Sequence, residues 1–315
     1  MEDIFLAFIC DLAFGDPYWF PHSVRGIGWI ISEMEKFIRV HFRTALGLKA
    51  AGVVMAICVP AMVWSVTFLL LKVAYLVHPN FYRFSNILLI YTALSAKSLA
   101  QEAGKVYKTL IEGDISRARK QLSYLVSRET HSLEEEGIVR ATVETVAENT
   151  VDGVLAPLLY AFLGGSPLAM AYKAINTLDS MVGYKNEKYI HLGWASARLD
   201  DMANLIPARL AGLLIPLASS FCGFNMVNSF KIVIRDRYNH TSPNAGFPES
   251  AVAGALGIQL GGESTYFGEK VVKPTIGDPV VPLKADHIKA AINIMYSVAV
   301  VMVLSGLIIS HWLKY

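Results

Sequence analysis

Two stretches of this chain, at 50–71 and 290–313, contain no Asp, Glu, Lys or Arg over 22 and 24 residues. Each is longer than the roughly 20 residues that a helix needs to cross the hydrocarbon of a bilayer. Backbone groups in lipid must pair within their own segment, so such stretches form helices. We therefore predict an all-α fold, a polytopic integral membrane helical bundle with large helical cytoplasmic loops.

The rest of the sequence agrees with a membrane protein. Its 54% hydrophobic and 17% charged residues differ from soluble averages in both respects. Shorter apolar segments are further candidate spans, whereas the opening segment is too short to span and predicts a half-buried first helix. A net charge of +2 gives no argument for nucleic acid. The three cysteines have neither disulfide nor zinc spacing. The shorter candidate spans are 85–96, 154–174 and 203–224.

Basic residues set the expected orientation, because cytoplasmic loops carry an excess of Lys and Arg. They cluster before the first long span and again after residue 96. We expect one membrane domain over residues 1–315 with its long loops in the cytoplasm. The predicted excursions are about 15–49, 97–150, 183–202 and 225–287, and a C-terminal transmembrane helix follows at about 288–313.

Glu144, Glu148 and Asp152 follow one another at intervals of four residues, just before an apolar run at 154–163. Four residues turn a helix by about 400°, so the three carboxylates share one face. Acids entering a membrane are costly unless they meet a cation, a proton or a substrate. We predict that all three are catalytic and that Glu148 and Asp152 also bind a metal. The alternative is a solvated face that pairs with a basic helix at 115–126.

Three polar residues accompany this acidic face. Asn149 lies within it, and Arg140 precedes Glu144 by one turn. His131 stands near the start of the same predicted helix, where a capping or surface role is the simpler interpretation. We assign all three to substrate or phosphate binding.

A second polar stripe runs through residues 172–189. Lys173, Asn176 and Asp179 recur at helical spacing on an otherwise apolar segment, and Lys185 follows in a loop. Carboxylate and amide oxygens followed by lysines suit a metal-bound phosphate, with Asp179 as a metal ligand and Asn176 and Lys185 on the substrate. The alternative for the lysines is a plain cytoplasmic loop.

A third group lies at the start of an apolar segment. Asp200 and Asp201 precede Asn204 by one turn, and Arg209 follows. The adjacent acids are typical of a divalent-cation site, with Asn204 and Arg209 on the substrate. A helix N-terminus would explain one of the acids but not the pair.

A fourth group occupies the turn-rich segment 15–28. Asp16, His22 and Arg25 are placed to bind a ligand at the membrane surface, and Arg25 is the member that we assign to substrate. The alternative is a polar interfacial loop anchored by Tyr18 and Trp19.

Several local signals predict where helices begin and end. Asp114 is a candidate N-cap for a helix at 115–126, and Ser132 with Glu135 forms a capping-box pattern. The glycine pair at 164–165 should interrupt the following helix. Strand signals are confined to 271–272 and 280–281, and the glycines between 254 and 262 suit small-residue helix packing.

Five long motifs, taken together and in order, resemble the CobD/CbiB family of cobalamin biosynthesis, adenosylcobinamide-phosphate synthase. The resemblance covers roughly residues 11–270, and it is much more specific than any one motif. The motifs are GDPYWFPHSVRGIG, SRETHSLEEEGIVRATVETVAENTVDG, AINTLDSMVGYKNEKY, GWASARLDDMANLIPARL and NHTSPNAGFPESAVAGALGIQLGG.

The resemblance implies a multi-pass enzyme of the cell inner membrane whose active site faces the cytoplasm. Such enzymes are ATP- and Mg²⁺-dependent ligases that join adenosylcobyric acid, a corrinoid, to 1-amino-2-propanol or its O-phosphate. Their product is an amide. The expected partners are these substrates and membrane lipid, with no nucleic acid. The resemblance also allows a homo-oligomer and contact with other late enzymes of the pathway.

On this resemblance the acidic residues form one site. Glu144, Glu148 and Asp152 hold metal or deprotonate the amine, and the other acids complete a metal and phosphate site. The supporting residues are Asn149, Asn176, Asp179, Asp200 and Asp201, and the phosphate clamps are Arg140, Lys185 and Arg209.

Two other functions remain open at the level of sequence. One is a Mg²⁺-dependent membrane enzyme like a prenyl- or phosphatidyltransferase, although the full acidic motifs of those enzymes are absent. The other is a non-catalytic relative that acts as a membrane sensor or binds a corrinoid.

Overall fold

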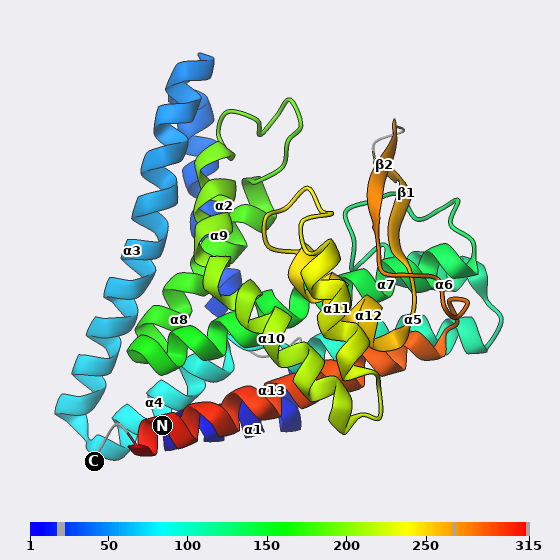
Figure 1. The fold of residues 1–315 in the computed structure, drawn as a ribbon. Helices are drawn as coiled ribbons and strands as arrows, with labels where there is room; N and C mark the ends of the chain where they lie inside the picture. Colours follow the sequence, from blue (N-terminus) through cyan, green and yellow to red (C-terminus); the bar gives the residue numbers. More distant parts are fainter. Residues whose placement is uncertain (18–22, 267–268, 313–315) are drawn as a thin grey trace. The chain divides into compact units, whose positions relative to one another are not determined.

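The computed structural model describes residues 1–17, 23–266 and 269–312. Helices account for most of them, and the described strands form a single hairpin. The predicted all-α membrane fold is therefore confirmed (Figure 1). The chain divides into two compact units, each built from segments that are far apart in sequence.

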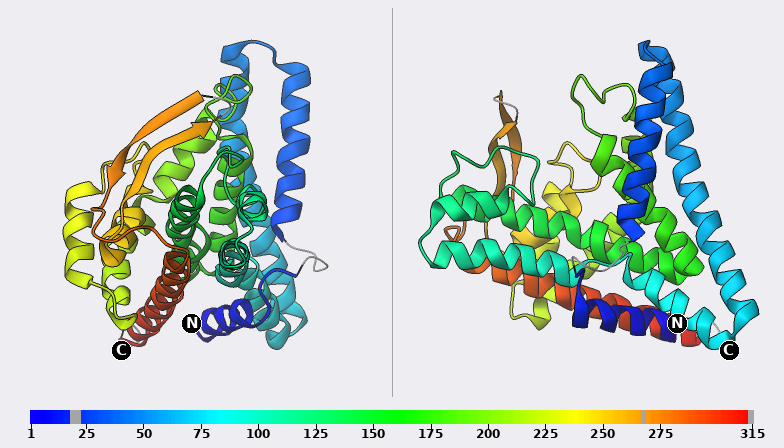
Figure 2. Two further views of the ribbon diagram at one scale, coloured as in Figure 1. Left: turned by 90° about the vertical axis from the view of Figure 1, so that its right-hand side faces the viewer. Right: turned by 180° about the vertical axis from the view of Figure 1, so that it is seen from behind.

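Unit 1 comprises Met1–Ser95, Ala156–Asn204 and Ser310–Tyr315. Its long helix α3 packs against α8, α4 and α9 and lies beside α2 (Figure 2). The side chain of Thr44 caps α3 by accepting a hydrogen bond from the Gly47 backbone. The helices of unit 1 are α1 (Glu2–Phe14), α2 (Ser23–His41), α3 (Ala45–Val77), α4 (Pro79–Tyr91), α8 (Ala156–Val182) and α9 (Trp194–Ala203).

Unit 2 comprises Ala96–Leu155 and Leu205–Ile309. Every residue of its helix α12 is buried, and this helix packs against α11, α10 and α7. The hairpin stands up from the helices of this unit (Figures 1 and 2). Its elements are α5 (Ala96–Ile111), α6 (Ile115–Leu122), α7 (Glu135–Thr150), the π-helix η1 (Val151–Leu155), α10 (Leu205–Phe221), α11 (Met226–Asp236), α12 (Gly246–Leu256), β1 (Leu260–Tyr266), β2 (Glu269–Ile276) and α13 (Asp286–Trp312).

Among the residues that the structure describes, three helical segments are long and apolar enough to cross a membrane: Ala45–Val77, Glu135–Val182 and Asp286–Ser310. The bent pair α9 and α10 would make a fourth if it is one span. The first and third confirm the two long runs of the sequence. The candidate span at 85–96 is wrong, because α4 has only 13 residues and ends at Tyr91.

The local signals had mixed outcomes. Asp114 does cap α6, accepting a hydrogen bond from the Arg117 backbone at 2.8 Å, although the helix ends at Leu122. The capping box at Ser132 is wrong, since α7 begins at Glu135 and its N-cap makes no side-chain hydrogen bond. The preceding segment is held instead by Arg119, whose Nε donates to a backbone carbonyl at residue 133.

The glycine signals were interpreted correctly at two places and incorrectly at a third. Gly164 and Gly165 do interrupt α8 with non-helical backbone angles. In the last excursion Gly254 does lie in a packed helix, α12, where an added Cβ would be 2.8 Å from the backbone oxygen of Asn228 in α11, whereas Gly261 and Gly262 belong to strand β1. Both have positive φ, at a register shift of the hairpin, where glycine avoids the strain that other residues would meet. The strand signal at 271–272 is confirmed, whereas 280–281 is not a strand.

Two glycines let the loop after α8 return closely to the helices of unit 1. A Cβ at Gly193 would lie 1.7 Å from the carbonyl oxygen of Val182, and one at Gly52 would lie 2.1 Å from the carbonyl oxygen of Leu192. Both neighbours are backbone atoms, which cannot rotate away. The close approach therefore requires glycine at both positions.

Replacing Gly193 by alanine should destabilise unit 1 by about 1–3 kcal/mol or more, because the new methyl group overlaps backbone. The melting temperature of the detergent-solubilised protein measures this effect. Gly26→Ala is the matched control, since nothing lies within 4 Å of its added Cβ. Equal melting temperatures for the two variants would contradict the close approach.

Candidate functional site

Glu144 is the centre of a buried charged cluster in unit 2. Its side chain is 6% exposed, and its Oε2 accepts a hydrogen bond from Arg128 Nη2 at 2.5 Å. Its Oε1 accepts a second from the Gly261 backbone at 2.8 Å. Helix α7, the segment before it and strand β1 are thereby joined at one carboxylate. A carboxylate satisfied in this way is better suited to holding the site together than to accepting a proton.

His240 and Glu249 lie beside this cluster. His240 belongs to the segment before α12, and its Nδ1 accepts a hydrogen bond from the Ser242 backbone at 2.9 Å. In the neutral ring the proton is therefore on Nε2, which lies 3.7 Å from Glu249 Oε1. Glu249 is in α12 and only 4% exposed.

Burial sets the charge of both groups. It lowers the pKa of His240 to about 4, helped by the nearby charge of Lys273. Burial, with the carboxylates of Glu144 and Glu148, raises the pKa of Glu249 well above its usual range. A neutral imidazole therefore faces a carboxyl group with a raised pKa, and shifted pairs of this kind are typical of acid–base sites.

Because the pKa of His240 is lowered in the folded protein, we expect the stability of the fold to depend on pH. The pKa of an unfolded histidine is about 6.5, so between pH 6.5 and 4 the unfolded chain binds the extra proton. The contribution of His240 is thus fully present above pH 6.5 and lost as the pH falls towards 4, by about 3 kcal/mol in total. Melting temperatures between pH 4.5 and 7.5 should fall less steeply in His240→Asn than in the natural protein. Identical slopes in the variant and the natural protein would contradict the shift.

Sequence reasoning missed Arg128, His240, Glu249 and Lys273. The signal for two of them was present in the motif NHTSPNAGFPES, which places His240 nine residues before Glu249. That spacing has no helical or strand period, because a loop and the start of α12 separate the two residues. Only the tertiary fold brings them together.

The other members of the predicted acidic face lie near this cluster or continue from it. Glu148 is exposed on α7, and Asn149 Nδ2 donates to the Thr145 carbonyl. Asp152 is half-buried but belongs to the π-helix, whose hydrogen bonds reach five residues instead of four. The regular four-residue face therefore ends before Asp152. Interruptions of this kind are frequent at functional sites.

In unit 1, Asp200 is part of a second polar network. Its Oδ2 accepts a hydrogen bond from Asn204 Nδ2 at 3.0 Å, while Tyr172 donates to Asn204 Oδ1 at 2.8 Å. Its Oδ1 is buried without a hydrogen-bond partner among the described residues. An unsatisfied buried carboxylate oxygen is costly, so it suits a position where a cation binds.

The neighbours of Asp200 match the prediction for this unit. Asn176, Asp179 and Asp201 all lie close enough to Asp200 to interact with its carboxylate. Lys185 is exposed in the loop after α8 and interacts in the same way with Asp201. The structure thus brings together three predicted metal ligands, Asp179, Asp200 and Asp201, and three predicted substrate residues, Asn176, Lys185 and Asn204.

The oxygen donors around Asp200 suit Mg²⁺, which keeps water ligands, better than a metal whose ligands all come from the protein. In the part of the chain that the structure describes, no group of three or more His, Cys, Asp or Glu residues is arranged to hold a metal ion. Mg²⁺ usually takes one or two carboxylates and completes its shell with water and phosphate oxygens. The open oxygen of Asp200, with one neighbouring acid, meets that requirement. The metal itself stays a prediction.

The predicted phosphate clamps occupy different places. Arg209 is in unit 2, where Nη1 donates to Asn244 Oδ1 at 2.8 Å and the guanidinium lies over the ring of Phe247. Arg140 Nη2 donates to Glu136 at 2.6 Å on the surface of α7. His131 is exposed, 3.7 Å from Glu129. The alternative that the acidic face pairs with the basic helix at 115–126 is wrong for Glu144, whose cation is Arg128.

Unit 1 contains two cavities near the predicted ligand site of the first loop. One has a volume of about 300 Å³ and a mixed lining that includes Asp16, Arg25, Ser95 and Lys173 together with apolar side chains. His22, Tyr18 and Trp19 lie outside the described residues.

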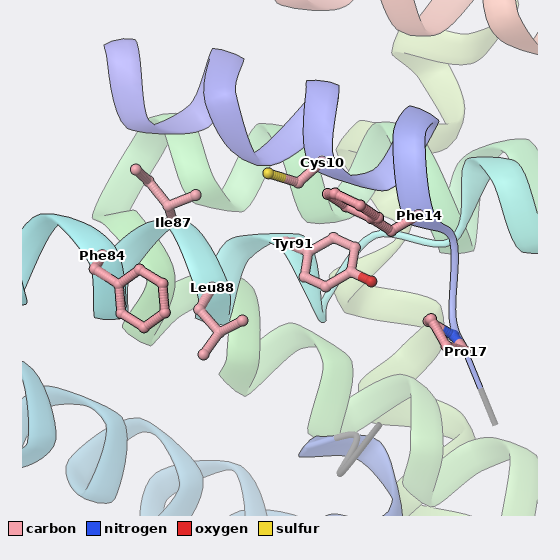
Figure 3. A pocket seen from close by; sticks show the side chains of 7 residues that line it. All are labelled: Cys10, Phe14, Pro17, Phe84, Ile87, Leu88 and Tyr91. Carbon is pink, nitrogen blue, oxygen red and sulfur yellow. The ribbon is translucent and has the colours of Figure 1, made fainter. Parts of the chain in front are cut away.

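The other cavity is apolar, has a volume of about 320 Å³, and lies between α1 and α4 (Figure 3). Tyr91 lines it and donates a hydrogen bond to the Gly15 carbonyl. Pro17 lines both cavities, so the two spaces adjoin at that residue. The structure therefore places the first loop close to Lys173 of α8. The sequence patterns had assigned these two parts to separate groups of polar residues.

Comparisons with known proteins identify one family over almost the whole chain. The model of the CobD/Cbib protein family matches residues 4–295. A relative named Cobalamin biosynthesis protein CobD, from Clostridium tetani, is 49% identical over 304 residues, covering 96% of this chain and 95% of the relative. A protein of the same name from Geobacter metallireducens is 49% identical over 301 residues, covering 96% and 94%. Cobalamin biosynthesis protein CbiB from Salmonella typhi is 47% identical over 291 residues, covering 92% and 91%. No solved structure matches this chain.

Proposed function

The chain belongs to the CobD/Cbib family of cobalamin biosynthesis proteins, and we propose that it is the ATP-dependent amide ligase of that pathway. It joins adenosylcobyric acid to 1-amino-2-propanol or to its O-phosphate and gives adenosylcobinamide or its phosphate. Its reaction takes place on the cytoplasmic side of the inner membrane. The proposal combines the family with a site in which acid–base groups lie beside membrane-spanning helices.

The arrangement of His240, Glu249 and Glu148 carries this proposal. An amine acceptor arrives as an ammonium ion at neutral pH and must lose a proton before it can attack. Glu148 is the exposed carboxylate of the cluster, whereas Glu144 is held by Arg128. Burial lowers the pKa of His240 and raises that of Glu249, and the two side chains are placed to relay a proton.

The chemistry requires activation of a carboxylate, which is a poor electrophile. ATP transfers its terminal phosphoryl group to the corrinoid carboxylate, giving an acyl phosphate and ADP. The amine nitrogen then forms a bond to the acyl carbon, the carbon–oxygen bond to phosphate breaks, and inorganic phosphate leaves. The nitrogen loses two protons on the way from ammonium ion to amide: we assign acceptance of the first to Glu148, and the departing phosphate takes up the second.

The second network would serve the nucleotide. Asp200, with Asp179 or Asp201, would hold Mg²⁺, which neutralises phosphate charge when it is bound. Asn204 orients the Asp200 carboxylate by a hydrogen bond, Asn176 lies beside it, and the exposed Lys185 supplies a cation for phosphate oxygens.

A turnover assay tests the proposal. Detergent-purified protein receives adenosylcobyric acid, MgATP and either aminopropanol or its phosphate, and the products are measured by mass spectrometry. We expect an amide product with stoichiometric ADP. Release of diphosphate without ADP would indicate a transferase instead. Corrinoid binding without product in either mixture would indicate a non-catalytic sensor or binding protein.

A further inference from the structure

A third cavity of unit 1 lies where helices α3, α4 and α8 pack together (Figure 1). Its volume of about 540 Å³ is within the ~300–1,000 Å³ typical of ligand pockets. Each of the three helices contributes polar groups to its lining, and Lys72 is the one charged residue among the described residues that line it. The polar contributors are Lys72 and Tyr75 of α3, Tyr82 and Asn86 of α4, and the backbone of Gly164 and Gly165 in α8.

Lys72 lies at the level expected for lipid headgroups. It is the first residue after the apolar run 50–71, and Lys49 is the last residue before it. A helix of 22 residues extends about 33 Å, close to the ~30 Å of the hydrocarbon core. The apolar side chains around Lys72 on α3, Leu69, Val73 and Leu76, are all exposed. The Lys72 ammonium group is therefore placed at the boundary between hydrocarbon and headgroups.

Lys72 has no counter-ion in the part of the chain that the structure describes. Its ammonium group makes no hydrogen bond and no ion pair with another described residue. By contrast, Arg83 of α4 is paired with Glu2 at 2.8 Å and with Asp3 at 3.2 Å. A charged side chain at membrane depth is costly unless an anion accompanies it. A phosphate group from the surrounding lipid is the anion available at this level.

The side chains of α3 and α4 offer hydrogen bonds to such a group. The rings of Tyr75 and Tyr82 meet edge to face, with 5.9 Å between their centroids, and neither hydroxyl group bonds another described residue. Tyrosines are typical of the membrane interface, where the ring is buried and the hydroxyl group meets polar headgroups. Asn86 Nδ2 donates to Asp3 Oδ2 at 2.9 Å, which leaves Asn86 Oδ1 to accept a hydrogen bond from a ligand.

The glycine pair of α8 makes the remaining side of the cavity polar. Gly164 and Gly165 have non-helical backbone angles inside the candidate span Glu135–Val182. Irregular backbone at membrane depth is tolerated where it is buried in protein or lines a cavity. Without side chains, these two residues let a ligand approach the backbone closely. The break in α8 therefore suits a polar ligand in this cavity.

The charge of the cavity distinguishes between phospholipids. In phosphatidylglycerol the single negative charge of the phosphate diester is uncompensated, and the headgroup ends in hydroxyl groups. In phosphatidylethanolamine and phosphatidylcholine a cationic amine within the headgroup cancels that charge. A lining with one cation and no acid therefore complements phosphatidylglycerol, whose acyl chains would lie along the exposed apolar side chains of α3.

We propose that this cavity binds the headgroup of an anionic phospholipid. Lys72 and the hydroxyl groups of Tyr75 and Tyr82 contact its phosphate, and Asn86 Oδ1 accepts a hydrogen bond from a headgroup hydroxyl. The inference does not depend on the proposed reaction, because none of these residues is assigned to it.

Native mass spectrometry of the full-length protein, purified in detergent and stripped of lipid, tests the site. The probes are phosphatidylglycerol, phosphatidylethanolamine and phosphatidylcholine with identical acyl chains. We expect phosphatidylglycerol to bind about fivefold more tightly than the other two, the effect of one lysine at a membrane surface. Lys72→Gln should remove this preference without changing the melting temperature in the absence of lipid, because the side chain is exposed. Equal affinity of the natural protein for the three lipids would overturn the inference.

Lys49→Gln is the matched control, since it removes the lysine at the other end of the same apolar run and outside the cavity. It should keep the natural preference. A loss of preference as large as that in Lys72→Gln would assign the effect to general surface charge and overturn the site. Tyr82→Phe keeps the ring but removes one hydroxyl group, so it should weaken phosphatidylglycerol about two- to tenfold. Natural affinity in that variant would overturn the placement of the phosphate.

Soluble competitors decide whether the ligand is a lipid or a free anion. Inorganic phosphate and glycerophosphoglycerol, the headgroup without acyl chains, should not displace phosphatidylglycerol even in large excess. Displacement by either would show a general anion site and overturn the lipid assignment. Thermal unfolding gives a second readout, because a ligand that binds only the folded state raises the melting temperature. Phosphatidylglycerol should raise that of the natural protein and of Lys49→Gln but not that of Lys72→Gln, and an equal rise in all three would contradict the site.

Discussion

Replacing Arg128 by methionine will lower the free energy of unfolding by about 3–5 kcal/mol, because it leaves the Glu144 carboxylate buried without its cation. Both side chains are largely shielded from water, at 12% and 6% exposure, so solvent cannot replace the lost partner. Methionine keeps most of the length and the apolar stem of arginine, which limits any cavity. Thermal unfolding in detergent, followed by tryptophan fluorescence, measures the change.

Two further variants decide whether the charge is responsible. The double variant Arg128→Met with Glu144→Gln removes both charges and should recover much of the loss. Arg117→Met removes an arginine from an exposed pair with Glu112 in the same unit and should cost at most about 1 kcal/mol. If the double variant is as unstable as Arg128→Met, packing and not charge is the cause.

Replacing Glu148 by glutamine will reduce amide formation by about 10²–10⁴-fold, the usual effect of removing a general base. The side chain is exposed on α7, so the amide should leave the melting temperature nearly unchanged. Initial rates with saturating acceptor report kcat directly. Raising the pH should not restore the activity, because the variant has no group that titrates at this position.

Glu135→Gln is the control on the same helix. Its carboxylate lies in the first turn of α7 and is exposed, so its loss should affect only the interaction with the helix dipole, by about 0.3–1 kcal/mol. Turnover in that variant should equal that of the natural protein. Near-natural turnover in Glu148→Gln would remove Glu148 from the chemistry.

The sequence predicted the class of fold because hydrophobic length is a local property. The runs at 50–71 and 290–313 lie within helices α3 and α13, with no tertiary information needed. The hairpin was harder to predict, since β1 is rich in glycine and lacks the β-branched alternation typical of strands. Its pairing with β2 depends on the tertiary fold, which a local pattern does not contain.

For the candidate site, too, local sequence patterns predicted contacts within one helix but not contacts that depend on the tertiary fold. Helical spacing grouped Asn176 with Asp179 and Asp200 with Asn204, and the structure places all four in one network of unit 1. Spacing could not find the contact between His240 and Glu249, nor the cation that pairs with Glu144, because loops separate those residues. The roles of the predicted residues stay predictions until the variants are assayed.

The hydrogen bond from Gly261 to Glu144 joins residues that are 117 positions apart. At about 5–20 residues per second, a ribosome needs roughly 6–23 s to make the intervening chain. Arg128 is made before Glu144, so the cation that pairs with this carboxylate in the folded protein is already present in the nascent chain. The acidic helix can therefore reach the membrane machinery together with the cation that compensates this charge, and the hairpin completes the site only late in synthesis.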